Sequence, residues 1–572
     1  MTDLSTRGPS ADRMVPTLVR LREALQAARL PLDIPDVEIA RKARTELIDQ
    51  LEDYILPRLI QIDAPLLTVV GGSTGAGKST LVNSLVGQRV TEPGVLRPTT
   101  RSPVLVFNPA DADWFANPRI LPDLRRTDNA SADPGALQLV ESLAIPAGLA
   151  VLDAPDIDSV EEQNRTLAAQ LLGAADLWLF VTSAARYADQ VPWEFLRSAA
   201  ERSAAVAIVL DRTEPAAVHE VSTHLARMLS ARGLRDSPLF VVPEGDVDEA
   251  GLLPSNTVRE IRGWLSSLAA DSGARQSVVR QTLDGAIRTL STRSFSVADA
   301  CHDQVQIQTR LRRDAESAYE AALTRIDHET EDGSLLRGEV LARWQEFVGT
   351  GEVLRGLESN VSRIRDRVSN AVKGQPQHAT LVTTAIENGL QSVVVEHVEA
   401  AAEQAAAAWQ SIAAGRALLA GSPEDLARAS SDFRARTGRT IREWQQGVLD
   451  AMRDEGAEKR TSPRFLAYGV NGLAVALMIT VLVPSTGGAV PTDSSAALGQ
   501  KILETVFGDQ SYRRLATQAR DDLNHRMLLL LESEQRRFSD LLEGLGVSVA
   551  VEEELRAGAR DIDDVRFASH PL

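Results

Sequence analysis

The stretch that decides the fold is Gly72-Ser-Thr-Gly-Ala-Gly-Lys-Ser79, a full match to the pattern GxxxxGK[ST]. It follows an apolar run, Pro65–Val70, and precedes Thr80-Leu-Val-Asn-Ser-Leu85, which has the apolar spacing of a helix. In such a strand–loop–helix unit, backbone N–H groups of the loop surround phosphate oxygens, the lysine reaches the β- and γ-phosphates, and the next hydroxyl ligates Mg²⁺. The predicted phosphate loop comprises Gly72, Ser73, Thr74, Gly75, Ala76, Gly77, Lys78, Ser79 and Thr80.

Short apolar runs alternate with amphipathic stretches on both sides of this loop. The runs are Pro65–Val70, Pro103–Phe107, Gly148–Leu152, Leu177–Val181, Ala205–Leu210 and Pro238–Val242. Strands that alternate with helices form mainly parallel sheets whose two faces are covered. We therefore expect an α/β P-loop domain with a mainly parallel sheet and helices on both faces.

Beyond residue 255 the strand pattern stops, and long helical stretches follow. The expected organisation is a set of N-terminal helices at 1–60 that pack with the helical bundle, the P-loop domain at 61–255, an all-α bundle or stalk at 256–460, an apolar insert at 461–510, and a returning helix with an acidic tail at 511–572. Within the bundle, Trp344, Trp409 and Trp444 are expected to be buried anchors.

Composition narrows the possible partners and cofactors. The 572 residues include 61 basic and 79 acidic side chains, and the net charge of −18 opposes a nucleic-acid partner or an anionic lipid held by diffuse charge. The single cysteine, Cys301, excludes an intrachain disulfide framework and a cysteine-based metal site. The first residues lack the apolar segment of a secretory signal, so we expect a cytoplasmic protein.

Two downstream segments have the positions of nucleotide-sensing motifs. Val95-Leu-Arg-Pro-Thr-Thr-Arg-Ser-Pro103 precedes the second predicted strand, where a switch threonine senses Mg²⁺ and the γ-phosphate. Thr100 is the first candidate, Thr99 is the second, and a polar turn without this role is the alternative. Leu152-Asp-Ala-Pro-Asp156 ends the third predicted strand, where Asp153 would hold Mg²⁺ through water.

With these motifs in this order, the sequence resembles the dynamin superfamily of large GTPases, and in particular bacterial dynamin-like proteins of the actinobacterial kind. The resemblance implies a GTPase head on a helical stalk, a membrane-binding tip, GTP and Mg²⁺ as ligands, and self-assembly as a homodimer or larger assembly through the G domain and stalk. A paralogous dynamin-like partner is a further implication. Lys78, Thr100 and Asp153 would be the catalytic residues, and Ser79, Thr100 and Asp153 would organise the metal.

Three departures from the family pattern concern the nucleotide. Asp156 replaces the glycine of DxPG, which disfavours close contact with the γ-phosphate. Asp211-Arg-Thr-Glu214 stands where the family has NKxD or TKxD. Glu214 would accept hydrogen bonds from the guanine N1 and N2 groups, and the Arg212 stem would stack on the base. Because this motif is altered, ATP stays an alternative nucleotide. Thr74 and Gly75 replace a glutamine and a serine, so hydrolysis is expected to be slow or dependent on dimerisation.

The apolar insert begins with Phe465–Val483, which is 19 residues without a charge. As a helix it would be about 28 Å long, close to the roughly 30 Å of a hydrocarbon core. Lys459, Arg460 and Arg464 precede it, as in a cytoplasmic flank. The preferred interpretation is a hairpin-like tip at 465–495 that enters one leaflet on the inner face of the cell membrane or folds away when soluble, and the alternative is a buried bundle helix.

Two functional hypotheses follow from these features. The first is a GTP-binding and GTP-hydrolysing protein, peripheral to or partly inserted in the membrane, that self-assembles to remodel or fuse it. The second is a nucleotide-gated scaffold with little turnover, which acts through a partner protein or a paralogous GTPase.

Overall fold

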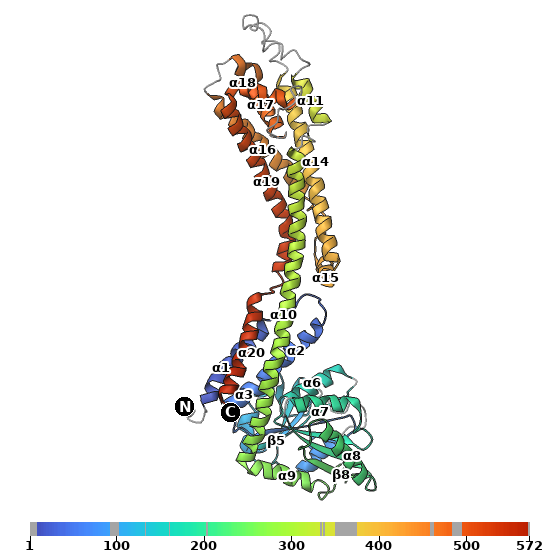
Figure 1. Ribbon diagram of the computed structural model, residues 1–572. Helices are drawn as coiled ribbons and strands as arrows, with labels where there is room; N and C mark the ends of the chain where they lie inside the picture. The colour runs from blue at the N-terminus through green and yellow to red at the C-terminus, as the bar shows by residue number, and fades with distance from the viewer. Residues whose placement is uncertain are drawn as a thin grey trace. The chain divides into compact units, whose positions relative to one another are not determined.

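The computed structural model describes residues 9–91, 102–131, 133–159, 161–201, 204–331, 335, 338–348, 375–457, 463–482 and 495–569. It divides into two compact units. Unit 1 consists of Met1–Leu30, Asp36–Asp303 and Ser548–Leu572, and unit 2 consists of Pro31–Pro35 and Gln304–Val547. Figure 1 shows both units and labels many of their helices, with β5 and β8 of the sheet.

Unit 1 is built on a sheet of eight strands in the order β3-β4-β2-β5-β1-β6-β7-β8. The pairs are parallel except β2 with β5, which is antiparallel. The strands are β1 (Leu66–Gly72), β2 (Val104–Phe107), β3 (Arg125–Thr127), β4 (Ala136–Glu141), β5 (Leu149–Asp153), β6 (Leu177–Ser183), β7 (Ala205–Thr213) and β8 (Leu239–Pro243). This confirms the predicted mainly parallel sheet, and each of the six predicted runs forms a strand.

The sheet separates two hydrophobic cores, because successive side chains of a strand point to opposite faces. On β1, Leu67 and Val69 belong to one core and Leu66 and Val70 to the other. The first core is covered by α6 (Glu162–Gly173), α7 (Gln190–Glu201) and α8 (Val218–Ala231), and the second by α4 (Lys78–Val86), α9 (Arg259–Ala270) and the start of α10 (Ser272–Glu331). The expectation of helices on both faces is thus confirmed.

Helices from both ends of the chain also belong to unit 1. They are α1 (Pro9–Ala27), α2 (Val37–Gln50), the π-helical turn η2 (Leu51–Ile55), α3 (Leu56–Ile60) and α20 (Val549–Ser569). The short helices η3 (Pro109–Asp111) and α5 (Ala112–Phe115) follow β2. Helices α1 and α20 pack closely, since a Cβ built on Gly558 would lie 3.2 Å from Leu21 Cδ1.

The two compact units differ from the predicted segments. The sequence interpretation had residues 1–60 pack with the helical bundle, whereas α1 to α3 lie in the same unit as the sheet, and so does α20 of the expected segment 511–572. The predicted boundary at residue 255 also differs, because the division falls inside α10, after Asp303. Helix α10 is continuous, and the sequence holds no Pro or Gly break there that would reveal a boundary.

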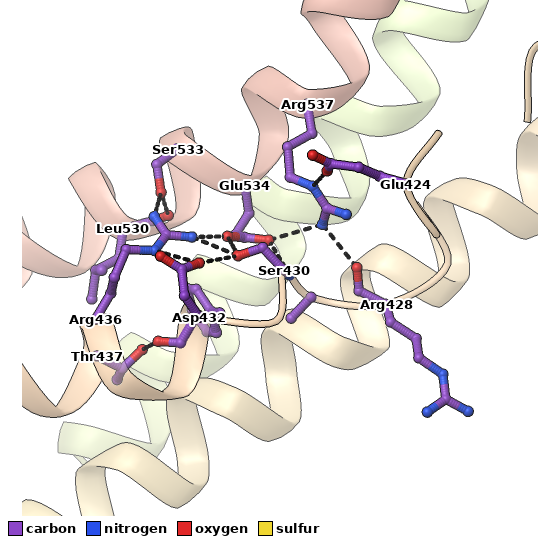
Figure 2. A network of polar contacts seen from close by, with 12 residues as sticks. Glu424, Arg428, Ser430, Asp432, Arg436, Thr437, Leu530, Ser533, Glu534 and Arg537 are labelled. Carbon is purple, nitrogen blue, oxygen red and sulfur yellow. Dashed lines mark hydrogen bonds and ion pairs between the residues drawn. The ribbon is translucent and has the colours of Figure 1, made fainter. Parts of the chain in front are cut away.

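The described part of unit 2 is helical and contains the second half of α10. Its other helices are α11 (Glu339–Val348), α14 (Gln375–Gln410), α15 (Ala413–Gly421), α16 (Phe433–Glu455), α17 (Pro463–Val481), α18 (Ser495–Phe507) and α19 (Asp509–Glu543). Trp344, Trp409 and Trp444 are buried in its core, as expected. Figure 2 shows the polar contacts that attach the connection between α15 and α16 to Glu534 of α19.

The charge-free segment of the predicted insert forms α17, with a break in helical geometry at Gly469. From Leu473 to Ile479 every side chain is buried, in contact with α14, α16, α18 and α19. The structure therefore shows the buried bundle helix that was the alternative in the sequence interpretation. Among the described residues, no helix combines the length and the apolar character needed to cross a bilayer. Residues 483–494 of the insert, and Lys459 and Arg460 before it, lie outside the described residues.

Candidate functional site

The predicted phosphate loop lies between the end of β1 and the start of α4. Gly77 precedes the helix with φ +96°, and Gly75 has φ +74°, both in the region that favours glycine. A Cβ built on Gly77 would lie 1.9 Å from Asp211 Oδ2, and one on Gly72 would lie 1.9 Å from Val181 O. The loop therefore needs glycine at both positions, and it leads into a helix N-terminus suited to an anion.

Lys78 is the first residue of α4 and is 5% exposed. Its ammonium donates to Gly72 O and Ser73 O, each at 3.0 Å, and to Asp156 Oδ1. Asp156 is also buried, so the structure pairs the phosphate-loop lysine with the carboxylate that replaces the DxPG glycine.

Asp153 ends β5 beside Val70 of β1 and is completely buried. Neither of its carboxylate oxygens has a donor in hydrogen-bond geometry, although the hydroxyls of Ser79 and Thr91 lie near it. Burial raises the pKa of Asp153 to about 6. A buried carboxylate without a partner next to a hydroxyl is a donor set that fits Mg²⁺, which prefers oxygen ligands and keeps several waters. Ser79 and Asp153 would hold the ion.

The other predicted metal residue, Thr100, and its alternative, Thr99, lie outside the described residues. Sequence reasoning did not predict Thr91, which lies near Asp153. Its buried hydroxyl also lacks a partner, and its backbone N–H donates to Asn83 Oδ1 at 2.9 Å. It follows α4 without any motif, so the sequence offers no signal for it.

A second pair that sequence reasoning missed holds the tip of the loop. Asp158 Oδ1 accepts from the backbone N–H and the hydroxyl of Thr74, at 2.6 and 2.7 Å. Arg186 donates to Thr74 O at 2.9 Å and forms an ion pair with Asp158 at 2.8 Å. These residues are far apart in the sequence and belong to no local pattern, yet they determine the position of Thr74.

Of the predicted base-reading residues, Asp211 and Arg212 lie at the end of β7, and Glu214 follows the strand. The Asp211 carboxylate lies against Gly77, as the built Cβ shows, and its Oδ1 accepts from the Arg212 backbone N–H at 2.8 Å. Burial raises the pKa of Asp211 to about 6. Arg212 adopts φ +49°, and its Nε lies 3.9 Å from the Cβ built on Gly77. Glu214 is exposed, and no contact places it at the loop.

The described residues thus bring a phosphate loop, a lysine, a metal-type carboxylate and the Asp211-Arg212 pair together at one end of the sheet. This set suits binding of a nucleoside phosphate with Mg²⁺. The motifs that carry these residues occur in the same order as in dynamin-superfamily GTPases. The chain resembles the dynamin-like GTPases.

Comparisons with known proteins give a curated relative and several distant solved structures. No family model matches the chain. A curated relative, the "Probable transmembrane GTPase FZO-like, chloroplastic" of Arabidopsis thaliana, is 24% identical over 178 residues, which is 31% of this chain. The aligned region spans only 18% of that relative's length.

Solved structures that align with the chain are distant. One belongs to an oligomerised bacterial dynamin pair described in terms of long-range sensing and tethering of membranes; it covers all of this chain and 96% of its own, with 10% identity and a TM-score of 0.34. LeoA, a bacterial dynamin GTPase from ETEC, aligns over the whole of both chains with 11% identity and a TM-score of 0.24. Toc33 from Arabidopsis thaliana, solved with Mg²⁺ and GMPPNP, covers 41% of this chain with 16% identity and a TM-score of 0.24.

Proposed function

We propose that this protein binds and hydrolyses GTP and uses nucleotide-dependent self-assembly to remodel or fuse a membrane. The observation that carries the proposal is the complete phosphate loop between β1 and α4, with the buried, unpartnered carboxylate of Asp153 beside it. A glycine-rich loop alone is a weak indication, but the loop with an adjacent metal-type acid is the arrangement that nucleoside triphosphate chemistry requires.

In this proposal the chain's own residues act by position and charge. Lys78 and the loop N–H groups neutralise phosphate oxygens, and Ser79, Thr100 and Asp153 arrange the metal, which supplies further charge neutralisation when bound. Water is the nucleophile. Among the described residues around the loop, no side chain is placed as its general base, so turnover rests on orientation and electrostatic stabilisation.

The direct test compares Lys78→Ala with Lys42→Ala, a matched loss of one lysine at a position that is 79% exposed on α2. Binding of GTP and of ATP is measured by calorimetry with Mg²⁺, and phosphate release is measured with each nucleotide. We expect Lys78→Ala to lose nucleotide binding, because the helix N-terminus alone holds a phosphate chain weakly, and Lys42→Ala to match the unchanged protein. Full GTPase activity in Lys78→Ala would contradict the proposal.

Lipid contact is proposed for residues 465–495, on the cytoplasmic face of the membrane. Since α17 is buried, this contact requires α17 to leave the core or residues 483–494 to act without it. A Cβ built on Gly499 would lie 3.2 Å from Thr480 Cγ2, so Thr480→Cys with Gly499→Cys is suited to a disulfide that fixes α17 on α18. The chain's own cysteine, Cys301, is buried.

We expect the oxidised double variant to lose co-sedimentation with anionic liposomes and to regain it on reduction. The two single-cysteine variants serve as controls and should sediment like the unchanged protein. If the oxidised protein still sediments, α17 does not make the lipid contact.

A second candidate function is a nucleotide-gated scaffold, and the Lys78–Asp156 pair favours it, because a lysine held by an acid is less available for the transition-state charge. Phosphate release with and without liposomes separates the two functions. Stimulated turnover supports the GTPase, whereas nucleotide binding with negligible turnover supports the scaffold.

A further inference from the structure

The ammonium of Lys78 has no donor left for a ligand. A lysine carries three N–H donors, and here they meet three acceptors: Gly72 O, Ser73 O and Asp156 Oδ1. The two carbonyls are neutral and belong to the loop itself. Asp156 is the charged partner, and the pair is almost entirely buried, with side-chain exposures of 5% and 7%.

The backbone fixes Asp156 in this position. Ala154 N–H donates to Val70 O at 3.2 Å and Ile157 N–H donates to Gly72 O at 3.4 Å, so the segment between them is attached to β1 on both sides. Pro155 further restricts the chain between these bonds. The carboxylate is therefore part of the phosphate site and not a mobile surface acid.

The place of Asp156 decides which phosphate it affects. It replaces the glycine of the DxPG pattern, a change that disfavours close contact with the γ-phosphate, and it holds Lys78, the lysine that reaches the β- and γ-phosphates. A β-phosphate is held mainly by the loop N–H groups, which Asp156 does not engage. A third phosphate adds negative charge near a buried carboxylate, and like charges in such a site repel strongly.

We propose that Asp156 acts as an internal substitute for the terminal phosphate and makes this site select nucleoside diphosphates over triphosphates. The inference rests on the proposed nucleotide binding and deepens it. A diphosphate binds with the Lys78–Asp156 pair intact, whereas a triphosphate binds only when Asp156 is displaced from Lys78. Binding of the triphosphate is thereby coupled to movement of the segment that follows β5.

The experiment measures the dissociation constants of GDP and of the non-hydrolysable triphosphate GMPPNP by calorimetry, with Mg²⁺, for the unchanged protein, Asp156→Asn, Asp156→Gly and Asp113→Asn. Asp156→Asn preserves the shape and removes the charge, and Asp113→Asn removes an exposed acid of α5. We expect the unchanged protein to bind GDP more tightly than GMPPNP. Each Asp156 variant should gain about tenfold or more for GMPPNP while GDP changes by less than about threefold.

A second readout is thermal unfolding, first without nucleotide and then with GMPPNP. Because Lys78 loses its charged partner in Asp156→Asn, the ligand-free variant should unfold at a lower temperature than Asp113→Asn. Adding GMPPNP should remove this difference in unfolding temperature. Equal affinities of the unchanged protein for GDP and GMPPNP, with an unaltered ratio in Asp156→Asn, would overturn the inference and leave nucleotide binding standing. Absence of binding of either nucleotide to any of these proteins would overturn the proposed function together with the inference.

Discussion

Gly77 lies against the Asp211 carboxylate at the end of β7, and the contact leaves no room for a side chain at Gly77. We predict that Gly77→Ala abolishes nucleotide binding, because its Cβ would overlap the Asp211 carboxylate. The matched control is Gly233→Ala, which has a similar positive φ of +81° but open space around the built Cβ. Gly233→Ala places similar backbone strain outside the loop, so it should bind GDP like the unchanged protein.

Asp153 allows a separate prediction about the metal. Asp153→Asn keeps the shape of the side chain but removes the charge that would attract Mg²⁺. We expect the gain in GDP affinity on adding Mg²⁺ to fall about tenfold or more, while affinity in EDTA stays unchanged. Calorimetric titrations of both proteins, with Mg²⁺ and with EDTA, check this. An unaltered Mg²⁺ effect would mean that Asp153 does not hold the ion.

A third residue, Asp53 of η2, gives a pH dependence that does not involve nucleotide. Burial raises its pKa to about 7, although a hydrogen bond from Gln170 at 2.9 Å opposes the shift. The folded protein keeps a proton on Asp53 that the unfolded chain releases above about pH 4, so this group's contribution to stability falls as the pH rises from about 4 to about 7.

We therefore predict that Asp53→Asn stabilises the protein more at high pH than at low pH. The gain in the free energy of unfolding should be about 2 kcal/mol larger at pH 8 than at pH 5, measured by urea unfolding. Asp113→Asn should give the same small effect at both values. A gain that does not vary with pH would show that Asp53 is charged in the folded protein.

At this scale, the sequence could predict which residues of contiguous motifs lie together, while their roles stay predictions. The loop Gly72–Ser79 and Asp153 have fixed local spacing, and the structure places them together. It did not predict Asp158 and Arg186, because their contact with Thr74 depends on the fold and not on spacing. The pairing of Asp156 with Lys78 was likewise invisible, although the substitution at the DxPG position was noticed.

Among the elements, the connection between α15 and α16 is held by one buried carboxylate (Figure 2). Glu534 is completely buried and accepts from Ser430 N at 2.9 Å, from Ser430 Oγ at 2.6 Å, and from Arg436 and Arg537. Removing one cation leaves a buried charge with fewer partners, which is costly.

We predict that Arg436→Ala lowers the free energy of unfolding of unit 2 by about 2–4 kcal/mol. Arg428→Ala is the matched control, because the Arg428 side chain is 79% exposed and points away from Glu534, while its carbonyl still accepts from Arg537 (Figure 2). Urea unfolding followed by helical circular dichroism measures both. Equal effects of the two variants would mean that Glu534 does not depend on Arg436.

The elements that the sequence missed have clear physical reasons. β3 is Arg125-Arg-Thr127, three residues without an apolar side chain, and it forms because β4 offers a parallel edge. β4 has partly exposed residues along most of its length and lies between turns. In contrast, the strands at the centre of the sheet are buried on both faces and therefore appear as continuous apolar runs. Helix α17 is apolar for a similar reason, which is why its pattern fitted both a membrane segment and a core helix.

For the molecule as a whole, the division into two units makes thermal unfolding informative. A ligand stabilises the unit that binds it, and the candidate site lies wholly in unit 1. We predict two unfolding transitions in calorimetry. Mg²⁺ with GDP should raise the midpoint temperature of one transition and change that of the other by less than about 1 °C. Gly77→Ala, which is expected not to bind GDP, should show both transitions without the shift. A single transition that moves as a whole would show that the two units unfold together.

The burial of α17 also bears on how fast this helix could enter a membrane. Lipid and the protein core are both apolar, so moving Leu473, Leu477 and Ile479 from one to the other changes the transfer free energy little. The packing around them must nevertheless open first, and that opening acts as an activation barrier. If α17 enters a membrane, its insertion will be slow, strongly accelerated by warming or mild urea, and independent of lipid concentration once opening limits the rate.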